Sequence, residues 1–339
     1  MGCFERRETH TIMLDDIYHG YLDWNMMFAA ERLGRLDAQK TGIAAYLARD
    51  SYYNDPRYAE TLLTLGFFDV QLFYHNHLQA LIGCRGIQTP EGAKALVVIV
   101  FRGSDQVQDW LQNLDIRMTR FLNKEKFPHL SRLKVHNGIF ERVHDFEDWS
   151  RRVIFKDGPL KGNLLQMLGD ELKRKQCFFW IIGHSLGGAM ATLYAARLCD
   201  CYNVSRNRIL SHTFGAPPIG NRYFAARYGH ESCLRAQKIK RKSDSLALFR
   251  FVNTEDPIPA PRFADVRVEK AQGGPIAQPP YRLLGFKHVG KEVRFSPRHL
   301  PGFYEKYKQF TGRRYNSSHF MKVHFMEAYI TGIDVLNTH

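Results

Sequence analysis

A G-x-S-x-G motif stands between an apolar run and a stretch of small residues, and this arrangement constrains the fold more than any other feature. The motif covers residues 183–187, follows the apolar run 177–182 and precedes the small-residue stretch 188–201. In this context the serine is expected on a tight turn from a strand into a helix, with its hydroxyl exposed and the next amide N–H free. The helix dipole would favour negative charge developing beside the serine. The alternative is a glycine-rich helix start that serves packing alone.

Apolar and β-branched runs alternate with stretches of helical periodicity along the rest of the chain. The periodicity predicts helices over 11–66, 138–155, 159–175 and 188–201, and a last one near 323–330. The apolar and alternating runs predict strands over 70–75, 78–84, 95–101, 177–182, 209–214 and 247–252. Strands that alternate with helices favour an α/β fold, with a mostly parallel central sheet and helices on both faces.

The length of the chain bears on its division into domains. At 339 residues it could hold two domains, although single α/β domains often reach this size. No internal repeat or low-complexity tract divides the sequence. We expect residues 1–37 to form an N-terminal helical extension and residues 38–339 to form one α/β domain.

The charge of the chain is strongly basic. Lys and Arg number 48 against 34 Asp and Glu, which gives a formal net charge of +14. Such an excess favours contact with anionic surfaces, either nucleic acid or acidic lipid. No recognisable nucleic-acid-binding module accompanies it, so we expect no nucleic-acid partner. The basic run 235–242 is either a solvated loop or a patch that contacts anionic phospholipid.

Hydropathy and cysteine usage bear on the compartment. The mean hydropathy is −0.37, and the longest apolar runs fall far short of the roughly 20 residues that span a bilayer. No apolar stretch follows the charged residues near the N-terminus, so we expect no secretory signal peptide. The 6 cysteines show no disulfide-framework spacing. These features predict a cytoplasmic or peripheral membrane protein, with leaderless secretion as a further route.

A serine on such a turn needs a base and an acid that orients the base. In strand–turn–helix arrangements of this kind the chain order is serine, acid, histidine. Asp256 comes just after the predicted strand 247–252, where the carboxyl end of a strand would present it. From spacing alone, Glu255 and Asp265 stay as alternatives, and the Asp-Pro pair at Asp256 is also typical of a simple turn.

Several further segments carry short motifs in a fixed order. They are 97–104, an apolar run that ends in Arg-Gly-Ser; 135–140, Val-His-Asn-Gly-Ile-Phe; 213–221, Thr-Phe-Gly-Ala-Pro-Pro-Ile-Gly-Asn; 252–259, Val-Asn-Thr-Glu-Asp-Pro-Ile-Pro; 288–290, His-Val-Gly; and 324–329, His-Phe-Met-Glu-Ala-Tyr. Together with the serine motif they resemble the class 3 lipase family of α/β-hydrolases, which includes fungal triacylglycerol lipases and plant acylhydrolases. The resemblance runs from about residue 40 to residue 330. Pro218 departs from it, since the family has arginine there.

This resemblance implies roles for particular residues. It implies that Ser185 is the nucleophile, that Asp256 is the acid, and that Ser104 and the backbone N–H of Leu186 form the oxyanion hole. It also implies that His324, just before the last helix, is the base. His319 and His288 are the alternatives, because the segment 317–323 leaves room for a shift of register. The resemblance makes His288 part of a separate structural motif.

The implied activity is hydrolysis of carboxylic esters of acylglycerols or glycerophospholipids through an acyl-enzyme. No metal or organic cofactor is needed for this chemistry, and the implied partners are a lipid ester and an anionic membrane or lipid interface. One alternative is a lipase-like signalling or scaffold protein without turnover. Another is a carboxylesterase or acyltransferase for soluble esters. Residues 105–122 are expected either to form a lid with an apolar face or to be an amphipathic helix packed on the core.

Overall fold

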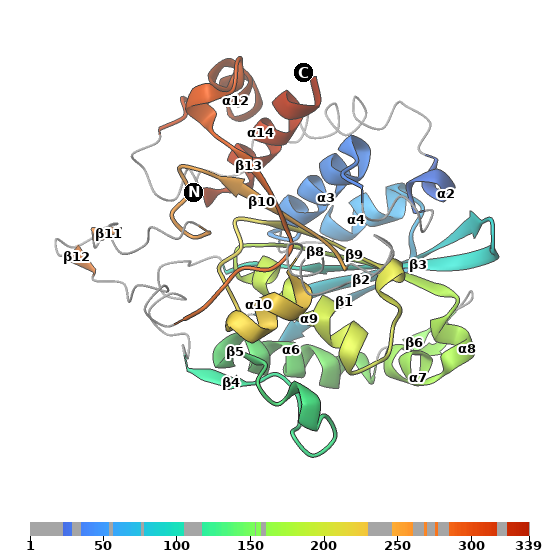
Figure 1. The fold of residues 1–339 in the computed structure, drawn as a ribbon. Coiled ribbons are helices and arrows are strands. Elements are labelled where there is room, and N and C mark those ends of the chain that lie inside the picture. The colour runs from blue at the N-terminus through green and yellow to red at the C-terminus, as the bar shows by residue number, and fades with distance from the viewer. Residues whose placement is uncertain are drawn as a thin grey trace.

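The fold is described from a computed structural model of the chain (Figure 1). The described residues are 23–28, 35–53, 57–75, 78–104, 117–152, 154–156, 161–229, 246–259, 268–269, 275–276, 285–316 and 324–338. The Asp265 and His319 alternatives, the basic run 235–242 and most of the expected lid lie outside these residues. In the part of the chain that is described, no helix is long and apolar enough to span a membrane.

A seven-stranded sheet forms the centre of the molecule, in the order β1-β2-β3-β8-β9-β10-β13. Its strands are β1 (Phe68–His75), β2 (Leu78–Thr89), β3 (Gly92–Phe101), β8 (Cys177–His184), β9 (Ile209–Phe214), β10 (Ala247–Asn253) and β13 (Lys291–Phe295). The first three strands pair antiparallel, and the pairs from β3 through to β13 are parallel. The prediction of an α/β fold with a mostly parallel sheet is therefore confirmed.

Short antiparallel pairs and helices complete the described structure. The pairs are β4 (Met118–Arg120) with β5 (Lys134–His136), β6 (Ile154–Phe155) with β7 (Gly162–Asn163), and β11 (Val268–Glu269) with β12 (Pro275–Ile276). The helices are α2 (Trp24–Met27), α3 (Ala38–Asp50), α4 (Arg57–Thr64), α6 (Asn137–Ser150), α7 (Leu164–Gly169), α8 (Glu171–Arg174), α9 (Leu186–Asp200), α10 (Arg222–Tyr228), α12 (Phe303–Thr311) and α14 (Met326–Thr338). Single 3-10 turns cover Pro128–Leu130, Arg206–Arg208 and Pro297–His299.

Helices cover both faces of the sheet, and strand β8 shows why. Successive side chains of a strand point to opposite faces. Phe179 and Ile181 join the core beneath α6 and α9, whereas Phe178, Trp180 and Ile182 join the core beneath α3 and α14. Because both faces are buried, the strand consists of continuous large apolar residues rather than an alternating pattern. Figure 1 shows α6, α9 and α10 on one side of the sheet, with α3, α12 and α14 on the other.

Three predicted elements differ from the structure. The helix predicted over 138–155 ends at Ser150, because residues 154–155 pair with β7 as strand β6. The helix predicted over 159–175 contains β7 and the two short helices α7 and α8. At the far end of the expected lid, residues 118–120 form strand β4, and Phe121 is fully buried in the core.

The N-terminal segment packs on the same core as the sheet. The Trp24 and Phe28 rings lie 6.4 and 5.2 Å from the Trp180 ring, measured between centroids. The Nζ atom of buried Lys40 donates a hydrogen bond to the carbonyl of Met27 at 2.8 Å. The boundary proposed between residues 37 and 38 stays a prediction.

Candidate active site

Ser185 lies on the turn that joins β8 to α9. Its φ is 55° and its ψ is −125°, a positive φ that residues other than glycine rarely adopt. The Ser185 N–H donates a hydrogen bond to the carbonyl of Phe214 at 2.9 Å. A Cβ added at Gly183 would lie 2.3 Å from the backbone of Gly187. The close approach of the backbone on both sides explains the two glycines of the motif.

His324 and Asp256 meet at this turn from distant parts of the chain. The Nε2 atom of His324 lies 2.8 Å from the Oγ of Ser185, and its Nδ1 lies 2.7 Å from the Oδ2 of Asp256. All three side chains are fully buried, so the Ser185 hydroxyl is not exposed as the motif predicts. The three residues predicted as nucleophile, acid and base are therefore brought together in one hydrogen-bonded chain.

The carboxylate of Asp256 is held by further donors. The Tyr329 hydroxyl donates to Oδ2 at 2.6 Å, and the N–H of Ile258 donates to Oδ1 at 2.9 Å. Burial, and then the charge of Asp256, raise the pKa of Tyr329 well above its usual value, so this phenol stays a protonated donor. Tyr329 was not predicted as part of the site, although it lies in the same 324–329 motif as His324.

Glycine at position 215 lets the chain pass close to these groups. Gly215 has a φ of 57°, and a Cβ there would lie 3.0 Å from the Oδ2 of Asp256 and 3.1 Å from the Cε1 of His324. A left-handed conformation at such a close approach favours glycine. The residue belongs to the 213–221 motif, for which no role in the site was predicted.

The two predicted oxyanion-hole residues come from the helix start after Ser185 and from the strand end that runs beside it. Leu186 is the first residue of α9, where backbone N–H groups at a helix start lack partners within the helix. Ser104 follows the end of β3 and is partly buried. The strand end runs beside the turn, since a Cβ at Gly103 would lie 3.2 Å from the Cβ of Ser185.

Glu255 and His288, the alternatives for acid and base that the structure describes, form hydrogen bonds elsewhere. The Oε1 of Glu255 accepts a hydrogen bond from the Nε of Arg298 at 2.9 Å. The Nε2 of His288 lies 2.8 Å from the carbonyl of Pro259. Burial lowers the pKa of His288 to about 3. Neither side chain takes part in the hydrogen-bonded chain at Ser185.

His184 contacts His324, and Tyr52 in turn contacts His184. The Nε2 of His184 lies 2.7 Å from the carbonyl of His324, and the two rings are 4.6 Å apart. The Nδ1 of His184 lies 2.7 Å from the hydroxyl of Tyr52. His184 stands in the serine motif, so its position in the sequence could have pointed to it. Tyr52 follows α3, 132 residues earlier, and no motif marks it.

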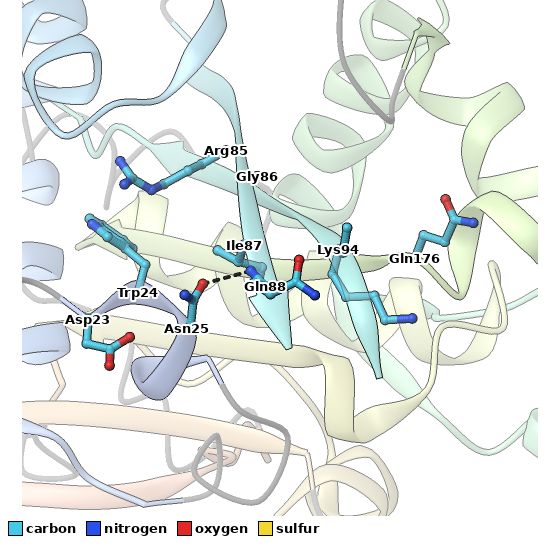
Figure 2. A pocket seen from close by; sticks show the side chains of 10 residues that line it. Asp23, Trp24, Asn25, Arg85, Gly86, Ile87, Gln88, Lys94 and Gln176 are labelled. Atoms are coloured by element: carbon cyan, nitrogen blue, oxygen red, sulfur yellow. Dashed lines mark hydrogen bonds between the residues drawn. The ribbon is translucent and has the colours of Figure 1, made fainter. Parts of the chain in front are cut away.

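A surface hollow of about 740 Å³ lies at the opposite end of the sheet (Figure 2). It is lined by residues of α2 and of the β2–β3 hairpin, and by Gln176, which precedes β8. There the Oδ1 of Asn25 accepts a hydrogen bond from the N–H of Gln88 at 2.7 Å. Strand β8 separates this hollow from Ser185 by about 25 Å at the usual rise per residue, so it is not part of the site. Among the described residues, no group of three or more His, Cys, Asp or Glu could hold a metal ion.

Comparisons with curated proteins give partial matches. The chloroplastic phospholipase A(1) DAD1 of Arabidopsis thaliana is 31% identical over 170 residues, which make up 48% of this chain and 32% of that protein. The lipase of Rhizomucor miehei is 28% identical over 131 residues, 38% of this chain and 31% of that protein. The chain thus spans about a third to a half of the length of the curated relatives it matches.

Solved structures with similar chains include fungal lipases. A triacylglycerol lipase whose structure is described as having a serine protease triad covers 75% of this chain at 20% identity, with a TM-score of 0.48 and 78% of its own length matched. Lipase II from Rhizopus niveus covers 76% of this chain at 16% identity, with a TM-score of 0.47 and 80% of its own length matched. Residues 98–265, which include Ser185 and Asp256, match the family model described as Lipase (class 3). Over this region, just under half of its length, the chain matches the class 3 lipase family.

Proposed function

We propose that this chain hydrolyses carboxylic esters of acylglycerols or glycerophospholipids through an acyl-enzyme on Ser185. One observation carries the proposal, the chain of contacts from the Ser185 Oγ to the His324 Nε2 and from the His324 Nδ1 to Asp256, at 2.8 and 2.7 Å. A serine needs such a base within hydrogen-bond reach to attack an ester carbonyl.

The proton movements follow from the chemistry of each atom. The Asp256 carboxylate accepts hydrogen bonds, so the His324 Nδ1 carries the hydrogen and Nε2 is free to accept the Ser185 proton. As Oγ attacks the ester carbonyl, Nε2 takes that proton and the ring becomes an imidazolium beside the carboxylate. The imidazolium then protonates the departing alcohol. A water molecule, deprotonated by the same nitrogen, then attacks the acyl-enzyme; the bond to the Ser185 Oγ breaks, Nε2 returns the proton to Oγ, and the fatty acid leaves.

The oxyanion of the tetrahedral intermediate is assigned to Leu186 and Ser104. The Leu186 N–H at the start of α9 would donate to it, with the positive end of the helix dipole behind. The Ser104 hydroxyl, at the end of β3, would be the second donor. Removing one such donor usually lowers kcat by about 100-fold to 1000-fold.

The substrate class rests on the family and on the names of its relatives. The family implies a lipid ester, and the matched plant proteins are named phospholipase A1 while the Rhizomucor miehei protein is named lipase. Because Ser185 is fully buried, a bulky lipid must displace part of the protein to reach it. We propose peripheral contact with anionic lipid as the setting, in keeping with the net charge of +14.

The test is labelling with a fluorophosphonate, which reacts with an activated serine, on the full chain and on Ser185→Ala. Fatty-acid release from phosphatidylcholine, phosphatidylglycerol and triacylglycerol emulsions is measured in parallel. We expect both signals in the wild type, and their loss by at least about 1000-fold in the variant, because no other nucleophile replaces Oγ.

The other outcomes separate the alternatives. A folded wild type that neither labels nor releases fatty acid, with and without detergent, would favour a scaffold without turnover and would overturn the proposal. Labelling accompanied by turnover of short soluble esters alone, with no rise in rate above the micellar threshold, would favour a carboxylesterase or acyltransferase.

A further inference from the structure

We propose that His184 and Tyr52 are positioning residues that fix the catalytic base His324 through its backbone carbonyl. This inference rests on the proposed function and adds to it a support that contacts the backbone carbonyl of His324, whereas Asp256 contacts its ring Nδ1. Neither residue touches the reacting atoms, so both would act through His324.

Three contacts define the support. The His184 Nε2 lies 2.7 Å from the carbonyl oxygen of His324, and the Tyr52 hydroxyl lies 2.7 Å from the His184 Nδ1. The His184 and His324 rings face each other with an interplanar angle of 37° and a centroid separation of 4.6 Å. His184 therefore contacts His324 both at its backbone carbonyl and at its ring.

The chemistry of the three groups fixes the direction of every hydrogen bond. A carbonyl oxygen only accepts, so the His184 Nε2 carries a hydrogen and donates it to His324. In the neutral ring Nδ1 is then an acceptor, so the Tyr52 hydroxyl donates to it. Tyr52 thus selects the one neutral tautomer of His184 that can hold the base.

A neutral His184 suits this position. Burial, and then the neighbouring His324, lower the pKa of His184 well below its usual value. A second imidazolium 4.6 Å away would oppose the positive charge that His324 gains when it takes the Ser185 proton.

Tyr52 also touches the strand end that leads to Ser104. A Cβ added at Gly103 would lie 2.1 Å from the Tyr52 hydroxyl, so the glycine makes room for the phenol. The guanidinium of buried Arg102 lies 5.6 Å from the centre of the Tyr52 ring. The Tyr52 side chain therefore contacts the segment 102–104 at the end of β3 and, through His184, is connected to His324.

The first test compares three single variants by kcat and KM. Tyr52→Phe removes only the hydroxyl, His184→Leu removes donor and acceptor, and His184→Gln keeps a side-chain N–H donor with an oxygen acceptor. We expect kcat to fall about 5-fold in Y52F and about 30-fold in H184L, and to stay within about 3-fold in H184Q. KM should change less than 2-fold, because substrate contacts stay intact.

A double-mutant cycle tests the connection itself. If Tyr52 acts through His184, the Y52F/H184L double variant should match H184L, about 30-fold below wild type. Independent effects would multiply to about 150-fold. The rate of fluorophosphonate labelling should follow the same order, since it reports the Ser185–His324 pair without a lipid substrate.

His212→Leu is the matched control. His212 is another fully buried histidine, whose Nδ1 accepts a hydrogen bond from the Trp180 Nε1 at 3.0 Å, and it belongs to the core rather than to the site. We expect H212L to lower the melting temperature as much as H184L does, while its kcat at a permissive temperature stays that of the wild type.

Three results would overturn the inference while leaving the proposed function intact. In the first, the wild type is active and H184L and Y52F have the same kcat as it does. In the second, H184Q loses as much kcat as H184L. In the third, H212L loses as much kcat as H184L. A wild type without labelling or turnover would instead be a failure of the proposed function.

Discussion

Ser185 has a backbone conformation that most side chains avoid, and its neighbours show how it is maintained. A positive φ at a non-glycine residue costs about 1–3 kcal/mol when the surrounding structure imposes it. Here it places the hydroxyl against His324 and leaves the Leu186 N–H at the helix start. The glycines beside it are needed for space, since a Cβ at Gly187 would lie 2.1 Å from the carbonyl oxygen of Phe101.

This crowding predicts a strong effect of a single methyl group. Gly187→Ala should lower the free energy of unfolding by about 3 kcal/mol, because the obstructing atoms are backbone and cannot rotate away. Gly42→Ala is the matched control, since it lies inside α3 with nothing within 4 Å of its added Cβ. It should raise the free energy of unfolding by about 0.5–1 kcal/mol. Urea denaturation checks both, and equal effects would contradict the crowding argument.

Among individual residues, the three proposed catalytic residues could be predicted from the sequence, but the contacts that link His184 and Tyr52 to His324 could not. Ser185, Asp256 and His324 stand in motifs or just after predicted strands, so each could be proposed from its context. His184 stands within the serine motif, but that motif is also compatible with a glycine-rich helix start that serves packing alone. Only the fold shows that His184 contacts the carbonyl of His324. Tyr52 comes from a turn after α3, and nothing local in the sequence ties it to a histidine 132 residues away.

Among the elements, α6 and α9 are joined by a buried ion pair. The guanidinium of Arg197 forms two hydrogen bonds of 2.6 Å with the carboxylate of Glu147, and both side chains are nearly inaccessible. Hydrogen bonding to Glu147 and its charge outweigh the effect of burial and raise the pKa of Arg197 above its usual value. The Arg197 guanidinium therefore keeps its positive charge.

Removing one partner of this pair should lower the free energy of unfolding far more than replacing both partners with apolar residues. Glu147→Gln should lower the free energy of unfolding by about 3–5 kcal/mol, because it leaves the Arg197 charge buried without its counter-charge. The double variant E147L/R197M should recover most of that loss. Thermal and urea unfolding measure both. The exposed pair Glu171–Lys175 is the control, and Lys175→Met should leave the midpoint unchanged.

Strands that are buried on both faces could be predicted from the sequence, and the edge strand β13 could not. Strands β3 and β8 are buried over most of their length and contain continuous apolar runs, whereas β9 and β10 are buried but also carry polar residues such as His212 and Arg250. Strand β13 was missed because it lies at the edge of the sheet and reads Lys-Glu-Val-Arg-Phe, with its first two residues exposed. Charged edge strands protect a sheet from further pairing, and they carry little hydrophobic signal.

The whole molecule keeps several histidines neutral in its interior, and this couples its stability to pH. Burial, and then the charge of Lys40, lower the pKa of His212 to about 3, and burial lowers that of His288 to about 3. In the unfolded chain a histidine has a pKa near 6.5. Between these values the unfolded state binds more protons, so stability is fully present above about pH 6.5 and is lost as the pH falls towards 3.

The size of this effect can be checked on one histidine. At pH 5, His212 should lower the free energy of unfolding by about 2 kcal/mol relative to pH 8. His212→Leu will be less stable at pH 8, since Trp180 loses its acceptor, but its stability should fall by about 2 kcal/mol less on going to pH 5. Urea unfolding at the two pH values measures the difference. Parallel pH dependences in variant and wild type would mean that His212 is not held neutral.

The separation of nucleophile and base along the chain has a consequence for synthesis. The base follows Ser185 by 139 residues, which a ribosome adds in roughly 7–28 s at 5–20 residues per second. Throughout that interval the nascent chain carries the serine, and later Asp256, without His324, the residue proposed as the base. On the proposed mechanism, ester cleavage could begin only after residue 324 has left the ribosome and the last helix has docked, so the order of the sequence would delay activity until most of the fold has formed.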